Sequence, residues 1–527
     1  MTQWFYEKNT EFLGSPVNKT FEEVLWMSKE EFRQWVIDLR KEVTRLWDEH
    51  GQPPRVGFSK SEIAEQFNDL QRVIPGKILA RDMDTGVYDV LHNTFVVGNA
   101  VNQFFPTMMK TRINYTKDVN AGKSIYDYFA QDELLDTFIT YASRHFKRDS
   151  FYSYSTPVRA SDNSVDHIPY AATGNDWIVK FESEKYRTRK KVEYWLCPVS
   201  EDTGYSGYNE ELRTKSNLRI TRSQIETLGP LIPEQCKTNV DWDRSEVYEI
   251  RVFTKGQKLF PVGLKAFRVS FCQYAVNFPP LVAKYIYETY TKEWKNEENI
   301  YVWDPSSGWG GRLLGALSTM DTRHLVYLGN DPNTDHNTTP GRTKYHEIVD
   351  FFREHVKPGS LVCPIDHIGF QFWQKGSEEM QFDPEFQKYQ GKLSLVFTSP
   401  PYFAKEAYSN DPNQSYRRFS QYDAWRDGFL KKTLQTAVLW LRPGGYLAWN
   451  IADAVFSGEN LPLEKDSCDI LEQLGMKHVE TLKMTLAQTP GGNRVDETTG
   501  KPKFKNSCRV ERSWRKFEPI YIFQKPK

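Results

Sequence analysis

A turn at the end of one apolar run combines residue types that can act on an amino group. Residues 393–397 (LSLVF) have the composition of a buried strand, and Ser399, Pro400, Pro401 and Tyr402 follow closely. Adjacent prolines cannot donate to a sheet ladder, so the strand must end there. The rigid turn would present a serine hydroxyl and a proline carbonyl to an exocyclic amino group, with a tyrosine ring for stacking. This suits a planar amino base removed from its helix, although an incidental serine beside a Pro-Pro strand end fits too.

A second candidate is the glycine-rich stretch DPSSGWGGR. It contains Asp304, Pro305, Ser306, Gly308, Gly310 and Gly311. The glycines permit tight turns and close approach of a ligand to the backbone. A helix that begins near the last glycine would offer free N–H groups to a carboxylate or phosphate, and Asp304 would accept from a cationic amine. A glycine turn after a strand also fits a dinucleotide-binding fold.

Two further acids follow apolar runs. Asp331 ends LVYLGND, where an acid can accept hydrogen bonds from ribose hydroxyls, although the Asp-Pro-Asn turn alone would also explain it. Asp366 ends SLVCPID, where it would accept from an adenine amino group or act as a simple cap. Together with Asp304, they place three acids at three consecutive strand ends.

The elements that must position these residues alternate between strand and helix from about residue 263. Strands are expected at 299–304, 325–331, 360–368, 393–398, 442–453, 478–488 and 517–525, with helices at 278–294, 311–317, 344–356, 422–441 and 468–476. This alternation predicts an α/β, doubly wound, mostly parallel sheet. Ligands of such sheets bind at the carboxyl ends of the strands, where the candidate residues fall.

The first half of the chain has a different residue pattern. Residues 1–150 are mainly helical in pattern, and Ser59 or Ser61 is placed to cap a helix that carries Ile63 and Phe67. Residues 151–262 alternate like strands and include the basic run KYRTRKK. We therefore expect a helical N-terminal region, a strand-rich middle region with a role in target recognition, and a third domain over 263–527.

The motifs of residues 263–527 resemble those of the amino-group (N4-cytosine and N6-adenine) AdoMet-dependent DNA methyltransferases. DPSSGWGGR is similar to the family's AdoMet motif, TSPPY to its catalytic motif of the SPPY type, NFPPLVAKYI to its extra motif, and RKFEPIYIFQK to its last hairpin strand. The resemblance implies a class I methyltransferase-like sheet, Rossmann-like, with an antiparallel C-terminal hairpin strand. It also implies S-adenosyl-L-methionine as cofactor and double-stranded DNA as partner.

Roles carried over from the resemblance follow the motifs. Phe278 and Pro279 would close over the methionine end of AdoMet, and the Asp304–Gly311 stretch would cradle the cofactor. Asp331 would hold the ribose and Asp366 would lie by the adenine. Residues 399–402 would hold a flipped target base, whose amine would attack the methyl group directly.

Two departures from the family pattern bear on the substrate. A serine is the first residue of the catalytic signature, and within the family this favours N4-cytosine over N6-adenine. Because serine is a poor base, the proton of the amino group would be lost to solvent.

No sizeable recognition domain follows the core, so the N-terminal half becomes the expected source of sequence recognition. The basic loop 489–515 would contact phosphates or simply be solvated. The lack of a Pro-Cys nucleophile argues against C5-cytosine chemistry.

Composition limits the remaining possibilities. The chain has 527 residues, enough for two or three domains, with 69 basic and 69 acidic side chains. Its six scattered cysteines form no CxxC pair, which predicts neither a metal site nor a disulfide framework. No long apolar run and no secretory signal are visible, so we expect a cytoplasmic protein with no membrane partner. An RNA or small-molecule methyltransferase, or a catalytically silent DNA-binding relative, remains the alternative.

Overall fold

The computed structural model describes most of the chain outside the middle region. The described residues are 12, 14–20, 23–24, 27–54, 58–113, 122–146, 192–198, 219–221, 247–254, 258, 275–319, 324–356, 368–487 and 505–527. Among them, no helix is both long enough and apolar enough to cross a membrane.

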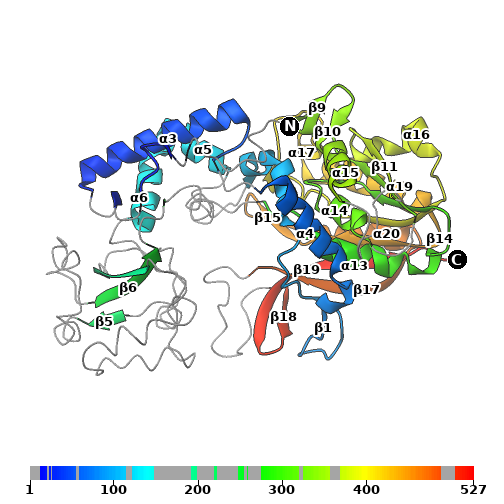
Figure 1. Cartoon of the computed structure of the whole chain (residues 1–527). Coiled ribbons are helices and arrows are strands. Elements are labelled where there is room, and N and C mark those ends of the chain that lie inside the picture. Colours follow the sequence, from blue (N-terminus) through cyan, green and yellow to red (C-terminus); the bar gives the residue numbers. More distant parts are fainter. Residues whose placement is uncertain are drawn as a thin grey trace.

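A ten-stranded sheet is built mainly from the second half of the chain and includes two short strands from the first half (Figure 1). Its strands follow the order β1 (Leu79–Ala80), β2 (Val90–Leu91), β17 (Lys477–Thr485), β19 (Ser513–Gln524), β14 (Leu441–Asn450), β12 (Leu393–Thr398), β7 (Ile300–Asp304), β8 (Leu325–Asn330) and β11 (Gly369–Trp373), with β18 (Ser507–Val510) on β19. The run from β14 to β11 is parallel, and β19 lies antiparallel between β14 and β17. The predicted doubly wound, mostly parallel sheet with an antiparallel C-terminal hairpin is confirmed.

Helices cover both faces of this sheet. One face packs on α13 (Pro280–Tyr290), α14 (Gly311–Leu317) and α15 (Lys344–His355), and the other on α16 (Pro384–Gln387), α18 (Tyr422–Trp425), α19 (Lys431–Trp440) and α20 (Leu463–Gln473). Side chains along β7 alternate between the two faces of the sheet and so contribute to the hydrophobic core on each face. Ile300 and Val302 point to the first face, and Trp303 points to the second. Short elements outside the sheet are β9 (Asn337–Thr339), β10 (Arg342–Thr343), β15 (Ala454–Phe456), β16 (Glu459–Leu461) and α17 (Ser415–Arg418).

Residues 58–113 belong to the same core, although they precede the rest of it by more than a hundred positions. Helix α4 (Lys60–Arg72) begins at the Ser59 cap, and its Phe67 ring stacks on Phe352 of α15 with centroids 4.4 Å apart. Strand β2 pairs in parallel with β17. The Lys284 ammonium of α13 donates to the carbonyls of Leu70, Gln71 and Val73 at the end of α4. The expected domain boundary at 263 therefore leaves out a segment that completes this core.

The remaining N-terminal helices pack on one another, and α5 also contacts the 106–113 segment. Helices α3 (Lys29–His50), α5 (Ile125–Ala130) and α6 (Leu135–Phe146) lie together beside the sheet domain (Figure 1). Buried Arg40 of α3 donates to the carbonyls of Tyr128 and Gln131. The described residues of the middle region form a three-stranded sheet of β4 (Val192–Pro198), β6 (Val247–Thr254) and β5 (Arg219–Thr221).

The third parallel strand differs from the expected one. It is β11, which pairs with β8 over Gly369–Trp373, whereas the sequence pattern placed it at 360–368. Strand β11 starts after Asp366, so this acid does not follow the strand, and Asp366 itself lies outside the described residues. The alternation of Phe370 and Phe372 in GFQFW was the signal for the observed strand.

Candidate active site

The two predicted turns meet at the carboxyl edge of the sheet because their strands are neighbours. Strand β7 ends at Asp304 and enters the glycine turn, and adjacent β12 ends at Thr398 and enters the Ser-Pro-Pro-Tyr turn. The Thr398 hydroxyl donates to the Asp304 carboxylate over 2.8 Å and lies 3.4 Å from the Ser306 carbonyl oxygen. The sheet therefore brings the two turns into direct contact.

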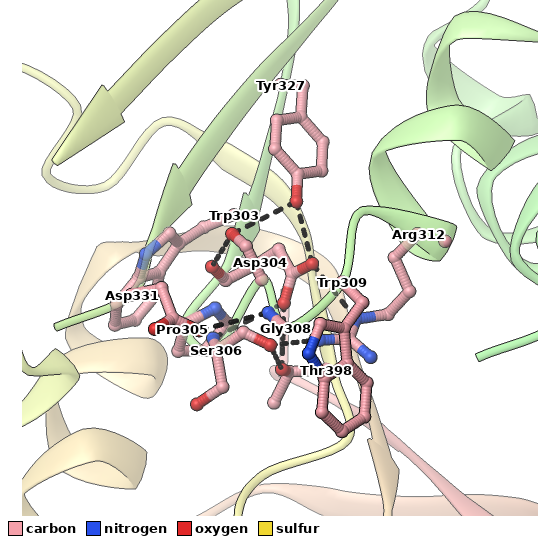
Figure 2. Close-up of polar contacts among 12 residues, drawn as sticks. Trp303, Asp304, Pro305, Ser306, Gly308, Trp309, Arg312, Tyr327, Asp331 and Thr398 are labelled. Atoms are coloured by element: carbon pink, nitrogen blue, oxygen red, sulfur yellow. Dashed lines mark hydrogen bonds and ion pairs between the residues drawn. The ribbon is translucent and has the colours of Figure 1, made fainter. Parts of the chain in front are cut away.

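Asp304 is the hub of a buried polar network (Figure 2). The residue is 0% exposed, and its carboxylate accepts hydrogen bonds from Thr398, from the Tyr327 hydroxyl (2.7 Å) and from the Arg312 guanidinium (2.9 Å). Burial alone would lower the pKa of Arg312, but the Asp304 carboxylate outweighs it and raises that pKa. The hydrogen-bond acceptor sites of the Asp304 carboxylate are therefore used by donors from the protein itself. The structure thus gives Asp304 internal partners in place of the cationic ligand amine expected from sequence.

Two glycines of the turn sit where no side chain fits. Gly310 has φ +74°, and a Cβ there would lie 2.8 Å from Ile348 and 3.0 Å from Phe105. A Cβ on Gly311 would lie 2.1 Å from the Phe278 carbonyl oxygen. The turn is therefore pressed between α15, the N-terminal segment and the segment before α13.

That segment before α13 closes the turn through a residue that sequence reasoning missed. The Asn277 side chain accepts from the Gly311 N–H (3.2 Å) and donates to the Trp309 carbonyl (2.8 Å) and to Asn102 (2.9 Å). The N–H of Gly311 is thus already bonded within the protein. Phe278 packs edge-on against Phe397 of β12 with centroids 5.3 Å apart, so the predicted extra motif does adjoin the site. Pro279 is the residue before α13.

Asp331 lies directly after β8 and faces the glycine turn. Its carboxylate accepts from the N–H groups of Gly308 and Asn333, each over 3.0 Å. The residue is half-buried, and burial raises its pKa to about 6 despite those hydrogen bonds. A carboxylate has about four acceptor sites, so capacity for ribose hydroxyls is left.

Asn330 and Gln374 hold the neighbouring strand ends and were also missed. Asn330 is buried at the end of β8, where it accepts from the Trp303 indole (2.8 Å) and donates to the carbonyls of Pro305 and Lys375 (3.0 Å each). Gln374 follows β11, so it takes the strand-end place that was expected for Asp366. The sequence marks these two residues only by their position directly after an apolar run. Because an amide residue at that position is also typical of an ordinary loop, the sequence did not single them out.

The Ser-Pro-Pro-Tyr turn is less enclosed. Ser399 and Pro401 are half-buried, whereas Pro400 is buried and Tyr402 is 9% exposed. The buried Tyr402 hydroxyl makes no hydrogen bond of good geometry with the described residues, and burial raises its pKa well above the ordinary value. The Lys405 ammonium lies 5.5 Å from the Tyr402 ring centroid, so little of this ring is open for stacking.

Within the described part of the chain, no group of three or more His, Cys, Asp or Glu side chains is arranged to hold a metal ion. The polar groups of the site are hydroxyls, carboxylates and backbone N–H groups, which can form hydrogen bonds with an organic ligand.

Comparisons with known proteins add little. No protein-family model matches the chain, and no curated protein matches it either. Similar solved structures include the CurJ carbon methyltransferase (TM-score 0.27, 11% identity, 51% of this chain and 60% of that one). They also include a candidate DNA modification methylase from Thermus thermophilus complexed with S-adenosyl-L-methionine (TM-score 0.19, 20% identity, 29% and 54%). A third is a SAM-dependent methyltransferase from Methanosarcina mazei (TM-score 0.23, 11% identity, 45% and 96%). At these scores none of the likenesses assigns a substrate to this chain.

Proposed function

We propose that this chain is an AdoMet-dependent methyltransferase that acts on the exocyclic amino group of a base in double-stranded DNA. The observation that carries the proposal is the contact between the two turns through Thr398, Asp304 and Ser306. A methyl donor on the glycine turn and an amino group on the Ser-Pro-Pro-Tyr turn would then meet within one site. Methyl transfer depends strongly on such positioning.

The residues at the glycine turn fit AdoMet. The Cβ-free surface at Gly308 and the half-buried Asp331 carboxylate provide a close backbone approach and acceptors for a ribose diol. Phe278 and Pro279 would border the methionine end, with Pro305, Ser306, Gly310 and Gly311 shaping the turn. When bound, the cofactor would supply an electrophilic methyl group.

At the other turn, the chain's own residues would hold the amine. The Ser399 hydroxyl and the Pro400 carbonyl would accept its N–H groups and orient its lone pair, and Pro401 would keep that backbone rigid. The Tyr402 hydroxyl, buried without a good hydrogen bond to the described residues, is a further polar group for the base. The serine favours cytosine N4 over adenine N6 slightly.

DNA contact would come from the N-terminal half and from the C-terminal hairpin. Arg509, Arg512 and Lys516 of the β18–β19 hairpin are exposed, whereas Lys505 is paired with Asp453 over 2.7 Å. Residues 488–504 of the basic loop lie outside the described residues. Phosphate contacts by exposed arginines would make binding fall with salt.

The proposal is tested by incubating the full chain with methyl-labelled AdoMet and unmethylated bacterial genomic DNA. We expect label in the DNA, and nucleoside mass spectrometry should identify N4-methylcytosine or N6-methyladenine. Total RNA is the matched alternative substrate. Label in RNA alone would replace DNA as the substrate, and label in neither would contradict action on nucleic acid.

A further inference from the structure

Glu406 and Tyr408 form a hydrogen-bonded pair that lies between the two turns. Neither residue has a role in the scheme above. The Tyr408 hydroxyl donates to the Glu406 carboxylate over 2.5 Å. The Tyr408 ring packs edge-on against Trp309 of the glycine turn, with centroids 5.6 Å apart. Glu406 itself follows Tyr402 by four residues. The Glu406–Tyr408 pair therefore connects the cofactor turn to the turn that would hold the base.

The pair is held firmly in place. Glu406 and Ala407 form strand β13, which pairs with β3 (Arg112–Ile113). Arg112 in turn donates to both carboxylate oxygens of the buried Asp127 on α5, each over 2.9 Å. A carboxylate on such a ribbon has a defined position, as a proton-transfer group requires.

Glu406 is half-buried and forms no ion pair with the described residues. A carboxylate partly removed from water without a directly paired cation is unfavourable for folding, which makes it a candidate for chemistry. Burial raises the pKa of Glu406, and the Tyr408 hydroxyl and Lys405 partly offset that effect. The charges around the pair are Lys405 on its own segment, Glu518 on β19 and Asp331 after β8, with the Tyr402 hydroxyl from the catalytic turn.

We propose that Glu406 accepts the proton released by the target amino group, and that Tyr408 positions its carboxylate. The inference rests on the proposed function. The amine nitrogen forms a bond to the methyl carbon as the carbon–sulfur bond of the donor breaks, so positive charge appears on nitrogen. The nitrogen–hydrogen bond would break in the same step, so that the proton moves to the Glu406 carboxylate as the methyl group transfers. The donor leaves as a neutral sulfide, and Glu406 later gives its proton to water.

Glu518 provides the matched control. It is also half-buried beside Tyr402, and burial raises its pKa too. It lies on β19, however, and makes no hydrogen bond to a residue packed on the glycine turn in the described part of the chain. Of the two carboxyls, only Glu406 is joined to that turn through Tyr408.

The test measures single-turnover methylation of bacterial genomic DNA by the full chain between pH 5.5 and 9, with AdoMet affinity measured separately. Glu406→Gln should lower the rate by about 100-fold or more, abolish its fall at acidic pH, and leave AdoMet affinity unchanged. Glu518→Gln should change the rate by less than about threefold. Equal losses in both variants, or a Glu406→Gln rate near wild type, would overturn the inference.

Tyr408→Phe keeps the test decisive if Glu406→Gln fails to fold. Because the Tyr408 hydrogen bond lowers the pKa of Glu406, its loss should move the acidic limb of the rate profile to higher pH. An unmoved limb in a folded variant would contradict the proposal. If wild type labels no nucleic acid, the proposed function fails instead, and the two failures stay distinct.

Discussion

The two turns at the carboxyl edge of the sheet contrast in how their polar groups are satisfied. In the glycine turn, the Asp304 carboxylate accepts hydrogen bonds from three other elements and is closed to solvent. In the Ser-Pro-Pro-Tyr turn, Ser399 is half-buried and the Tyr402 hydroxyl is buried without a good hydrogen bond to the described residues. The first turn is built for stability, and the second retains polar groups that a ligand would use.

This contrast separates two kinds of defect. A substitution in the glycine-turn network should appear first as lost folding stability and only then as lost ligand binding. Under the proposed function, a substitution at the Ser-Pro-Pro-Tyr turn should leave the fold intact and appear as lost activity. The predictions below test that division in order of expected size.

Asp304→Ala should have the largest effect. It leaves the buried Arg312 guanidinium without its counter-charge, which costs about 3–5 kcal/mol of unfolding free energy. Urea denaturation measures this loss. The double variant Asp304→Ala/Arg312→Met should recover part of it because no unpaired buried charge remains. A stable Asp304→Ala protein with weak AdoMet binding would instead restore a direct ligand role.

Ser399→Ala should have the second-largest effect. We expect this substitution to lower activity and to leave folding stability unchanged. Loss of a positioned hydrogen-bond partner lowers turnover by about 10²–10³-fold in comparable sites. Urea midpoint and calorimetric AdoMet affinity should both stay at wild-type values. Reduced AdoMet affinity would contradict the separate roles of the two turns.

Gly315→Ala tests packing behind the glycine turn. Its Cβ would lie 2.5 Å from Ala283 and 2.7 Å from the Pro280 carbonyl oxygen, so α14 must move from α13 at a cost of about 1–3 kcal/mol. Gly76→Ala is the matched control, because a Cβ there meets nothing within 4 Å. Equal denaturation midpoints for the two variants would show that the α13–α14 contact is not limiting.

The smallest effect concerns pH and Asp331. The pKa of Asp331 is about 6, so the group becomes protonated as pH falls below that value and loses acceptor capacity for ribose hydroxyls. AdoMet affinity should therefore weaken at low pH, by at most about tenfold per pH unit. Asp331→Asn should bind weakly at all pH values and show a flatter profile. Titration calorimetry at pH 7.5 and 5.5 provides the comparison.

Sequence patterns predicted the sheet well because each strand and helix carries its own signal. Strands β7, β8 and β12 are apolar runs that end at turn-forming residues, and α14 follows a glycine turn. The prediction of a shared edge for Asp304 and Ser399 needed only the rule that parallel strands align their carboxyl ends. The strand expected at 360–368 lies almost wholly outside the described residues, and the strand that pairs with β8 is GFQFW, which is less apolar than SLVCPID.

The internal partners of the site were not predictable in the same way. Asp304 has the expected position, but its role depends on Arg312, Tyr327 and Thr398, which come from three other elements. Helix α4 has a clear amphipathic pattern and is capped by Ser59, one of the two predicted serines, yet nothing local indicates that its apolar face meets Phe352. Such partners depend on tertiary contacts between distant segments.

The pairing of β2 with β17 has a consequence for how the protein is made. His92, next to β2, bonds to Thr485, and 393 residues separate them along the chain. At about 5–20 residues per second, a ribosome needs on the order of tens of seconds to synthesise that span. Throughout this interval β2 can pair with β1 but not with β17, so one edge of β2 and the apolar side chains that β17 later covers stay exposed, which makes nascent chains a natural client for chaperones.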